Sequence, residues 1–288
     1  MCGIIGLYHP TENVAGEIYD ALIQVQHRGQ DAAGIAAINK NKLSVHKDLG
    51  VVTEVFKTVE SLDLKGNVGI GHVRYPTAGC SDVSEAQPFH TINPVEICLA
   101  HNGTLTNSDE MREFLLNKKF CKFNTQSDSE VLLNLFAYEL SQTSFEVLKS
   151  FHIFSALKEV YKRCEGGFAV AVLVEGVGLV GFRDSNGIRP LVLGKKDDGS
   201  FMVASESSAL SALGYIFESD VNPGEAIIIS EQGGVERKTC SENVSHTPCL
   251  FEFVYFSRPD SIIDSISVHK ARLRMGDFLG EKILKNHS

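Results

Sequence analysis

Met1-Cys2-Gly3-Ile4-Ile5-Gly6-Leu7 opens the chain and decides how the rest of it is interpreted. A residue as small as Cys2 permits removal of Met1, after which one residue would carry both a thiol and a free α-amine. The thiol has an unperturbed pKa near ~8.5 and the amine near ~7.7–8.0, so the amine is a suitable base for its own thiol. The apolar run from Ile4 to Tyr8 predicts a buried strand that holds this terminus in place. Position 2 alone still favours the alternative, a frayed terminus with an incidental cysteine.

Composition narrows the classes of protein to which the chain can belong. Its 288 residues allow one large domain, or one domain and part of another. Acidic residues outnumber basic ones by 36 to 27, and the net charge of −9 argues against nucleic acid or an anionic membrane as a partner. No apolar run reaches the ~18–20 residues that span a bilayer. The seven cysteines are odd in number and lack C-x-x-C spacing, which predicts free thiols, a cytoplasmic location and no zinc site.

Two polar clusters lie where helices or strands are predicted to end. A helix over 15–26 leads into His27-Arg28-Gly29-Gln30-Asp31, a dense polar loop bounded by glycines. A strand that ends at Val73 places Arg74 at its end, before Pro76 stops the strand. Strand ends are where functional side chains gather, so both clusters are candidates for a site.

Two further motifs have structural interpretations that compete with functional ones. The apolar strand 96–101 runs into Asn102-Gly103, and Asn-Gly is the strongest short signal for a hairpin turn. Ser127-Asp128-Ser129-Glu130 has the spacing of a helix capping box. Asp128 would then be a first-turn acid stabilised by the helix dipole, which does not prevent it from binding a ligand.

The order of the predicted elements indicates the fold class and the domains. Strands and helices occur in blocks, which favours an α+β fold with antiparallel sheets over regular βαβ units. We predict a first domain over 2–230, a polar linker over 231–249 and the start of a truncated second domain over 250–288. In that last segment the pattern predicts a strand over 251–257 and a helix over 269–285.

Taken together and in order, five motifs resemble class II glutamine amidotransferase domains. They are Cys2-Gly3-Ile4-Ile5-Gly6, residues 27–34, residues 71–79, His101-Asn102-Gly103 and Ser127-Asp128-Ser129-Glu130. Segments 75–79, 182–191 and 256–261 resemble the members of this family in which a phosphoribosyltransferase domain follows the glutaminase. The resemblance covers essentially the whole chain. It implies the N-terminal nucleophile hydrolase fold, a four-layer αββα sandwich with two antiparallel sheets.

The resemblance implies a catalytic set of three residues. With Met1 removed, Cys2 would attack the side-chain amide of glutamine and form a γ-glutamyl thioester. Asn102 and the backbone N–H of Gly103 would form the oxyanion hole, and an amide with a neighbouring N–H does supply two donors to one oxygen. Because the α-amine is the base, the histidines beside these motifs are expected to orient loops.

It also implies a substrate-binding set. Arg74 would hold the α-carboxylate of glutamine and Asp128 its α-ammonium, since one guanidinium fork and one carboxylate recognise a free amino acid through charge-assisted hydrogen bonds. Arg28 would set the loop around the nucleophile, and Thr77 would line the substrate site.

In family members of this kind, one domain hydrolyses glutamine and a second domain uses the ammonia. Ammonia from glutamine passes to the phosphoribosyltransferase domain, for transfer to phosphoribosyl pyrophosphate in the first step of de novo purine synthesis. The phosphoribosyl pyrophosphate loop of that domain carries two adjacent acidic residues followed by small and hydroxyl residues. No segment here matches it, since the adjacent acids Asp197-Asp198 lie in a predicted hairpin of the first domain. We expect at most glutamine hydrolysis from the chain as given, no metal or other cofactor in it, Mg²⁺ for the missing domain, and a homo-oligomer when full length.

Three alternatives stay open. A class II glutaminase could serve another acceptor, such as a sugar phosphate or aspartate. A non-catalytic protein could keep the fold and bind glutamine or a subunit, although Cys2, Arg74, Asn102 and Asp128 are all present. A metal or iron–sulfur protein is the third, and the cysteine spacing gives no cluster pattern.

Overall fold

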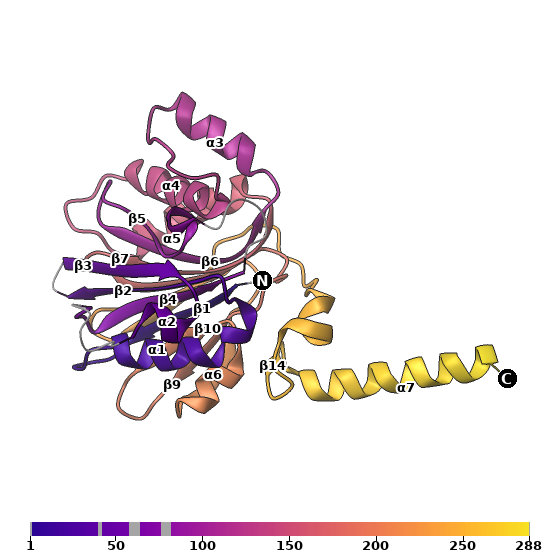
Figure 1. The fold of residues 1–288 in the computed structure, drawn as a ribbon. Coiled ribbons are helices and arrows are strands. Elements are labelled where there is room, and N and C mark those ends of the chain that lie inside the picture. The colour runs from indigo at the N-terminus through magenta and orange to yellow at the C-terminus, as the bar shows by residue number, and fades with distance from the viewer. Residues whose placement is uncertain (1, 40–41, 58–63, 76–81, 288) are drawn as a thin grey trace.

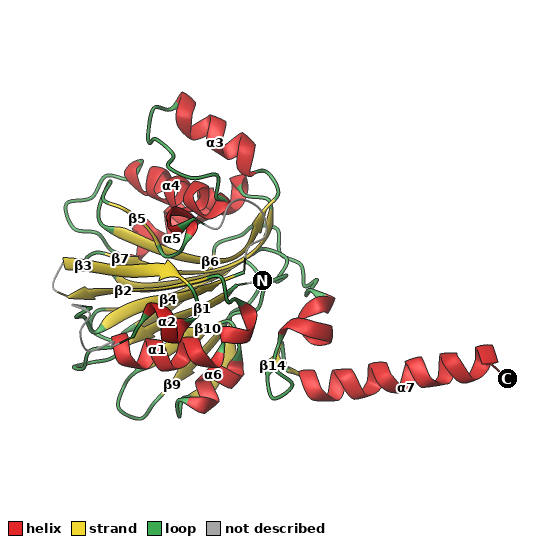
Figure 2. Ribbon diagram, viewed as in Figure 1, coloured by secondary structure: helices red, strands yellow, loops and turns green. Residues whose placement is uncertain are grey.

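Two antiparallel β-sheets lie face to face, with helices on both outer faces (Figures 1 and 2). The computed structural model describes residues 2–39, 42–57, 64–75 and 82–287. Apolar residues of both sheets share one buried cluster between them. A further cluster lies between each sheet and the helices that cover it. The predicted α+β fold, a four-layer αββα sandwich, is confirmed.

The first sheet is built around the start of the chain. Strand β1 (Gly3–Tyr8) pairs with β10 (Phe201–Ala204) on one side and β4 (Val68–Arg74) on the other. All six residues of β1 are buried, so the predicted buried strand is confirmed. The strand order is β11-β9-β10-β1-β4-β2-β3. The remaining strands of this sheet are β2 (Ala32–Asn39), β3 (Lys42–Leu49), β9 (Val192–Lys195) and β11 (Ile216–Asp220).

The second sheet corrects one expectation. Its order is β13-β12-β8-β7-β6-β5, and β6 (Ile97–Leu105) runs straight through Asn102-Gly103. Asn102 pairs with Ala169 and Gly103 with Phe168, so the hairpin interpretation of Asn-Gly is wrong. A full-length partner, β7 (Gly166–Val174), overrides the local turn preference. The other strands are β5 (Phe89–Thr91), β8 (Gly178–Arg183), β12 (Glu225–Ser230) and β13 (Val235–Thr239).

Helices cover the outer faces of both sheets (Figure 2). The first sheet is covered by α1 (Ala15–Gln24), α2 (Val52–Val55) and α6 (Ser207–Ala212). The second is covered by α4 (Asp128–Ser141) and α5 (Ser150–Arg163), and α3 (Ser108–Asn117) packs on α4. Short 3₁₀ turns, η1 (Gln26–Arg28) and η3 (Val83–Glu85), precede β2 and β5. No helix in the described part of the chain is long and apolar enough to cross a membrane.

The chain from residue 231 onward departs from expectation in two places. The predicted linker 231–249 contains β13, whose five residues are all exposed. An exposed edge strand rich in charge has no apolar alternation by which to recognise it. The predicted strand 251–257 is a π-helical turn, Glu252–Phe256. Its aromatic residues favour a strand locally, but Phe253 instead packs in a small separate apolar cluster.

Beyond this turn the chain forms a hairpin and a long helix. The hairpin consists of β14 (Ile262–Ile263) and β15 (Ile266–Ser267). The helix α7 (Val268–His287) includes the predicted helix 269–285 and projects away from the sandwich (Figure 1).

Candidate active site

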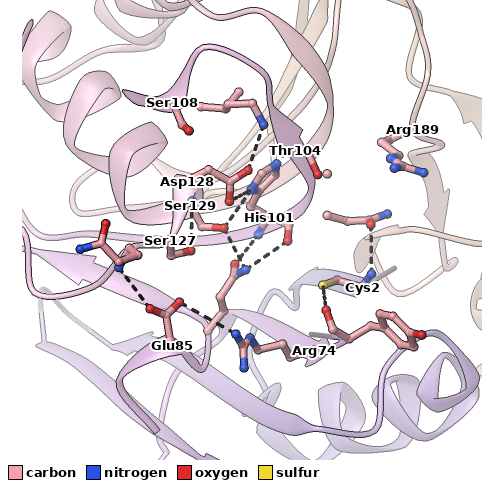
Figure 3. A pocket seen from close by; sticks show the side chains of 16 residues that line it. Cys2, Arg74, Glu85, His101, Thr104, Ser108, Ser127, Asp128, Ser129 and Arg189 are labelled. Carbon is pink, nitrogen blue, oxygen red and sulfur yellow. Dashed lines mark hydrogen bonds and ion pairs between the residues drawn. The ribbon is translucent and has the colours of Figure 1, made fainter. Parts of the chain in front are cut away.

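A cavity of about 260 Å³ opens where β1, β4 and β6 converge with the first turn of α4. Figure 3 shows the side chains that surround it. Residues far apart in the sequence meet here. Five of the seven predicted site residues line this cavity: Cys2, Arg74, Asn102, Gly103 and Asp128.

Cys2 directly precedes β1, and both its backbone and its side chain make polar contacts that hold it. Its backbone nitrogen donates to Oδ1 of Asn102 at 3.2 Å, and its Sγ lies 3.9 Å from the carbonyl oxygen of Tyr75. Burial raises the pKa of the Cys2 thiol, and this outweighs the opposing charges of Arg74 and Arg28. A thiol with a raised pKa is protonated at neutral pH, so a base is needed to make it a nucleophile.

Asn102 places an unused donor at the cavity. Its Oδ1 accepts from Cys2, while its Nδ2 is buried and has no hydrogen-bond partner in the described residues. A buried unsatisfied donor costs about 1–3 kcal/mol, a deficit that a substrate oxygen would remove. The next residue, Gly103, has no space for a side chain, because a Cβ would lie 2.2 Å from the carbonyl oxygen of Gly167.

A buried polar network behind the cavity fixes β6 at this point. Gln87 accepts from the backbone N–H of His101 at 2.7 Å and donates to the Ser129 hydroxyl at 3.0 Å. The Nδ1 of His101 lies 2.9 Å from the same hydroxyl. Burial lowers the pKa of His101, and it lowers that of His72 to about 3, so both imidazoles are neutral at pH 7. Gln87 was missed in the sequence, where it stands in a proline-containing loop.

Arg74 and Asp128 bring opposite charges to the cavity, and Asp128 lies across it from Arg74 in Figure 3. Arg74 Nη1 pairs with Asp31 at 2.7 Å, and its Nη2 lies 3.9 Å from Glu85. Asp128 Oδ2 accepts from the backbone N–H of Leu105 at 2.9 Å. Asp128 is therefore both a first-turn acid of α4 and a residue of the cavity wall.

Two predicted site residues do not line the cavity. Arg28 is 2% exposed and lies behind Cys2, where its Nε donates to the carbonyl oxygen of that residue at 2.9 Å. Its position fits the role of holding the nucleophile segment, but not direct contact with a ligand in the cavity. Thr77 lies outside the described residues.

The charge of Arg28 is balanced by two buried carboxylates. Its Nη1 lies 2.6 Å from Glu206 Oε1, and its Nη2 lies 2.9 Å from Glu252 Oε1. Burial alone would raise the pKa of Glu206, but the hydrogen bond with His27 and the charge of Arg28 outweigh it and lower the pKa to about 2. Neither carboxylate stands in a motif, so neither was predicted from the sequence.

Arg189 is a further cavity residue that sequence reasoning missed. Its Nε and Nη1 are buried without a hydrogen-bond partner in the described residues, and Nη1 lies 3.7 Å from Glu252. The Asp184 carboxylate accepts from the backbone N–H groups of Ile188 and Arg189 and so fixes this loop. The available signal was the Arg-Pro pair within segment 182–191, for which no role was predicted.

The described residues contain no group of three or more His, Cys, Asp or Glu side chains arranged to hold a metal ion. The arrangement brings together a thiol, an amide donor, and a cation and an anion on opposite walls.

Comparison with known proteins agrees with this geometry. The family model described as "Glutamine amidotransferase domain" matches residues 72–212. The amidophosphoribosyltransferase of Escherichia coli (strain K12) is 51% identical over 290 residues, and that of Saccharomyces cerevisiae (strain ATCC 204508 / S288c) is 45% identical over 295. Each alignment covers 99% of this chain, but 57% and 58% of the respective relative.

A solved structure is similar over the same extent. The B. subtilis glutamine phosphoribosylpyrophosphate amidotransferase, complexed with ADP and GMP, matches with a TM-score of 0.84 and 34% identity. The match covers 97% of this chain and 58% of that one. The chain thus spans less than two thirds of the length of these relatives.

The low pKa of Glu206 predicts how acid affects stability. A carboxylate whose pKa falls from an ordinary ~4.3 to about 2 stabilises the fold fully above the unfolded-state pKa, and the effect is lost as pH falls through the folded-state value. The difference in unfolding free energy between the wild type and Glu206→Gln should be constant above about pH 5 and shrink from about pH 4.5 downward. Urea unfolding between pH 3 and 7 measures it. Glu218→Gln, at a partly exposed surface pair with Lys195, is the control and should show no such dependence. A Glu206→Gln difference that stays constant down to pH 3 would contradict the assignment.

Proposed function

This chain belongs to the glutamine amidotransferase family, and from that premise we propose that it hydrolyses the side-chain amide of glutamine to glutamate and ammonia, with Cys2 as the nucleophile. The observation that carries the proposal is the double role of Asn102. Its Oδ1 holds the nitrogen of Cys2, and its buried Nδ2 is left free to donate. One amide thereby links the base, the nucleophile and the place where negative charge would develop.

The first half of the reaction forms a thioester. Once Met1 is removed, the Cys2 nitrogen is an α-amine, and it takes the thiol proton as sulfur attacks the amide carbon of glutamine. The carbonyl oxygen becomes an oxyanion that accepts from Asn102 Nδ2 and the Gly103 N–H. When the carbon–nitrogen bond breaks, the α-amine returns its proton to the departing nitrogen, and ammonia leaves.

The second half releases glutamate. Water loses a proton to the same α-amine and attacks the thioester carbon, and the same two donors bind the second oxyanion. The carbon–sulfur bond breaks, and the sulfur recovers the proton. Arg74 would bind the α-carboxylate of glutamine with donors that its pairs with Asp31 and Glu85 leave free, and Asp128 would bind the α-ammonium.

We further propose that the complete protein transfers the ammonia to phosphoribosyl pyrophosphate, as the names of its relatives state for them. The acceptor site would correspond to the part of the relatives that does not align with this chain, and Mg²⁺ would belong to that site. Helix α7 is consistent with a further domain, because it exposes apolar side chains that such a domain would cover. They include Leu273, Phe278, Leu279 and Leu284. Free thiols at Cys98 and Cys240 fit a cytoplasmic enzyme.

The role of Cys2 is tested by removing its sulfur. Cys2→Ala should abolish glutamine hydrolysis without unfolding the protein, because the structural contacts of the terminus are made by β1. Glutamate release and the circular dichroism spectrum measure the two effects. Cys98→Ala is the matched control: it removes a buried thiol that does not line the cavity and should keep turnover. Measurable turnover by Cys2→Ala would overturn the assignment.

The role of Asn102 is tested by removing its amide. Asn102→Ala should lower kcat on the order of 10²–10³-fold and change KM much less, because the donor acts mainly in the transition state. Steady-state kinetics of glutamate release measure both constants. Asn134→Ala removes another buried amide, one that bonds to the backbone of α4, and should leave kcat near the wild-type value. A large rise in KM with kcat unchanged would instead assign Asn102 to substrate binding.

The acceptor is tested in the full-length protein. Phosphoribosyl pyrophosphate should stimulate glutamine hydrolysis and consume the ammonia as phosphoribosylamine, whereas a hexose phosphate or aspartate should do neither. Coupled assays of glutamate and of the aminated product distinguish them. Stimulation by one of the other two acceptors would keep the glutaminase and replace the proposed acceptor. Absence of hydrolysis with any of them would favour a protein that only binds glutamine.

A further inference from the structure

The segment over residues 250–268 is attached to the sandwich by two buried bidentate ion pairs. Glu252, 1% exposed, accepts from Nη1 and Nη2 of Arg28 at 3.0 and 2.9 Å. Asp264 accepts from Nη1 and Nη2 of Arg183 at 2.7 and 2.9 Å. The two pairs have the same chemistry and hold the same segment, but they lie at different places in the fold.

Only the first of these two pairs reaches the nucleophile. The guanidinium that binds Glu252 also donates through its Nε to the carbonyl oxygen of Cys2 at 2.9 Å. Because a guanidinium is planar and rigid, a carboxylate that fixes the two outer nitrogens also fixes the direction of the Nε–H bond. The side chain of Arg183, by contrast, donates to the carbonyl oxygens of Gly187, Arg189 and Val221.

Glu206 shares Arg28 but cannot replace Glu252. It contacts Nη1 through one oxygen, and its other oxygen accepts from the Arg258 N–H and the Ser261 hydroxyl, both at 2.9 Å. A single contact leaves the guanidinium free to turn about that bond, whereas the bidentate contact with Glu252 does not. Glu252 is itself fixed by the Ser257 hydroxyl at 2.9 Å.

We propose that Glu252 is a positioning residue for the nucleophile: through the fork of Arg28 it fixes the carbonyl of Cys2, and with it the position of the Cys2 sulfur in the cavity. The proposal rests on the proposed function, in which Cys2 attacks glutamine. Glu252 belongs to neither central sheet, so the 250–268 segment becomes part of the glutaminase machinery. A displacement of this segment would therefore change turnover through Arg28, and it would also move a neighbour of the cavity-lining Arg189, whose Nη1 lies 3.7 Å from Glu252.

The test compares two variants of the chain with Met1 removed. Glu252→Gln keeps the shape of the side chain, and Glu206 still balances the charge of Arg28, so the variant is expected to fold. It should lower kcat for glutamine hydrolysis about 10–100-fold, because a small displacement of the sulfur from the amide carbon slows the reaction. KM should stay within about twofold, because the residues proposed to bind glutamine are unchanged.

Asp264→Asn is the matched control: it removes a carboxylate from the other anchor of the same segment. Arg183 also binds the carbonyl of the cavity residue Arg189. Asp184 holds that loop independently through the N–H groups of Ile188 and Arg189, so kcat should be kept.

Two further measurements separate positioning from general loss of structure. The ¹³Cβ resonance of Cys2, in protein labelled at cysteine, should shift in Glu252→Gln and not in Asp264→Asn. Arg28→Lys keeps the charge but loses the fork, so it should reproduce the fall in kcat. The double variant Arg28→Lys/Glu252→Gln should then fall little further, because both changes break one linkage.

The outcomes are distinct. Equal losses of kcat in Glu252→Gln and Asp264→Asn, in proportion to their thermal destabilisation, would overturn the proposal in favour of a structural role. An unchanged Cys2 resonance with wild-type kcat in Glu252→Gln would also overturn it, while the glutaminase assignment stands. If the wild type hydrolyses no glutamine but the Cys2 resonance shifts in Glu252→Gln alone, the proposed function fails, and what stands is that Glu252 fixes Cys2, without a role in glutamine hydrolysis.

Discussion

The rest of the structure depends on a terminal strand that is paired on both sides. Strand β1 lies between β4 and β10 and is buried along its whole length, so the backbone of Cys2, directly before it, is held in place. The glycines of the opening motif make this burial possible. A Cβ at Gly6 would lie 2.7 Å from side chains of Leu179 in the second sheet and Val203 in the first. Cys2 is thus positioned by packing of the strand that follows it, and Asn102 reaches it from the opposite sheet.

Polar groups are distributed unevenly around this centre. Away from the cavity, charges are paired: Arg28 with Glu206 and Glu252, and Arg183 with Asp264. At the cavity, buried donors are left without partners. Among the described residues, four of the seven buried polar side-chain atoms that lack a hydrogen bond belong to cavity-lining residues. These atoms are His101 Nε2, Asn102 Nδ2, and Nε and Nη1 of Arg189. A buried polar atom without a partner costs free energy, and a ligand that forms the missing hydrogen bond would remove that cost.

Sequence patterns predicted the parts of this arrangement that are local. The apolar run after Cys2, the strand ending at Arg74 and the cap before Asp128 each depend on neighbouring residues, and each element is present. Asn102-Gly103 was misassigned to a turn because the strand that straightens it lies some sixty residues later in the sequence.

Long-range partners could not be predicted at all. Glu206 and Arg28 are 178 positions apart, and Glu252 and Arg28 are 224 apart, so no periodicity relates them. The predicted strand 251–257 was wrong for a related reason. Aromatic residues indicate burial, but not whether a sheet edge or a helix surface will provide it. The roles of Cys2, Asn102, Gly103, Arg74 and Asp128 came from resemblance rather than from pattern, and they stay proposals.

The central position of β1 has a kinetic consequence. Most chain termini open locally, at little free-energy cost, but a strand with neighbours on both sides of a sheet can leave only when the sheet itself opens. The backbone of Cys2 is therefore held at the cavity for about as long as the native state survives, while its thiol, which lines the cavity, remains accessible to a ligand. Displacement of Cys2 from the cavity and loss of the fold therefore become a single event, with a single lifetime.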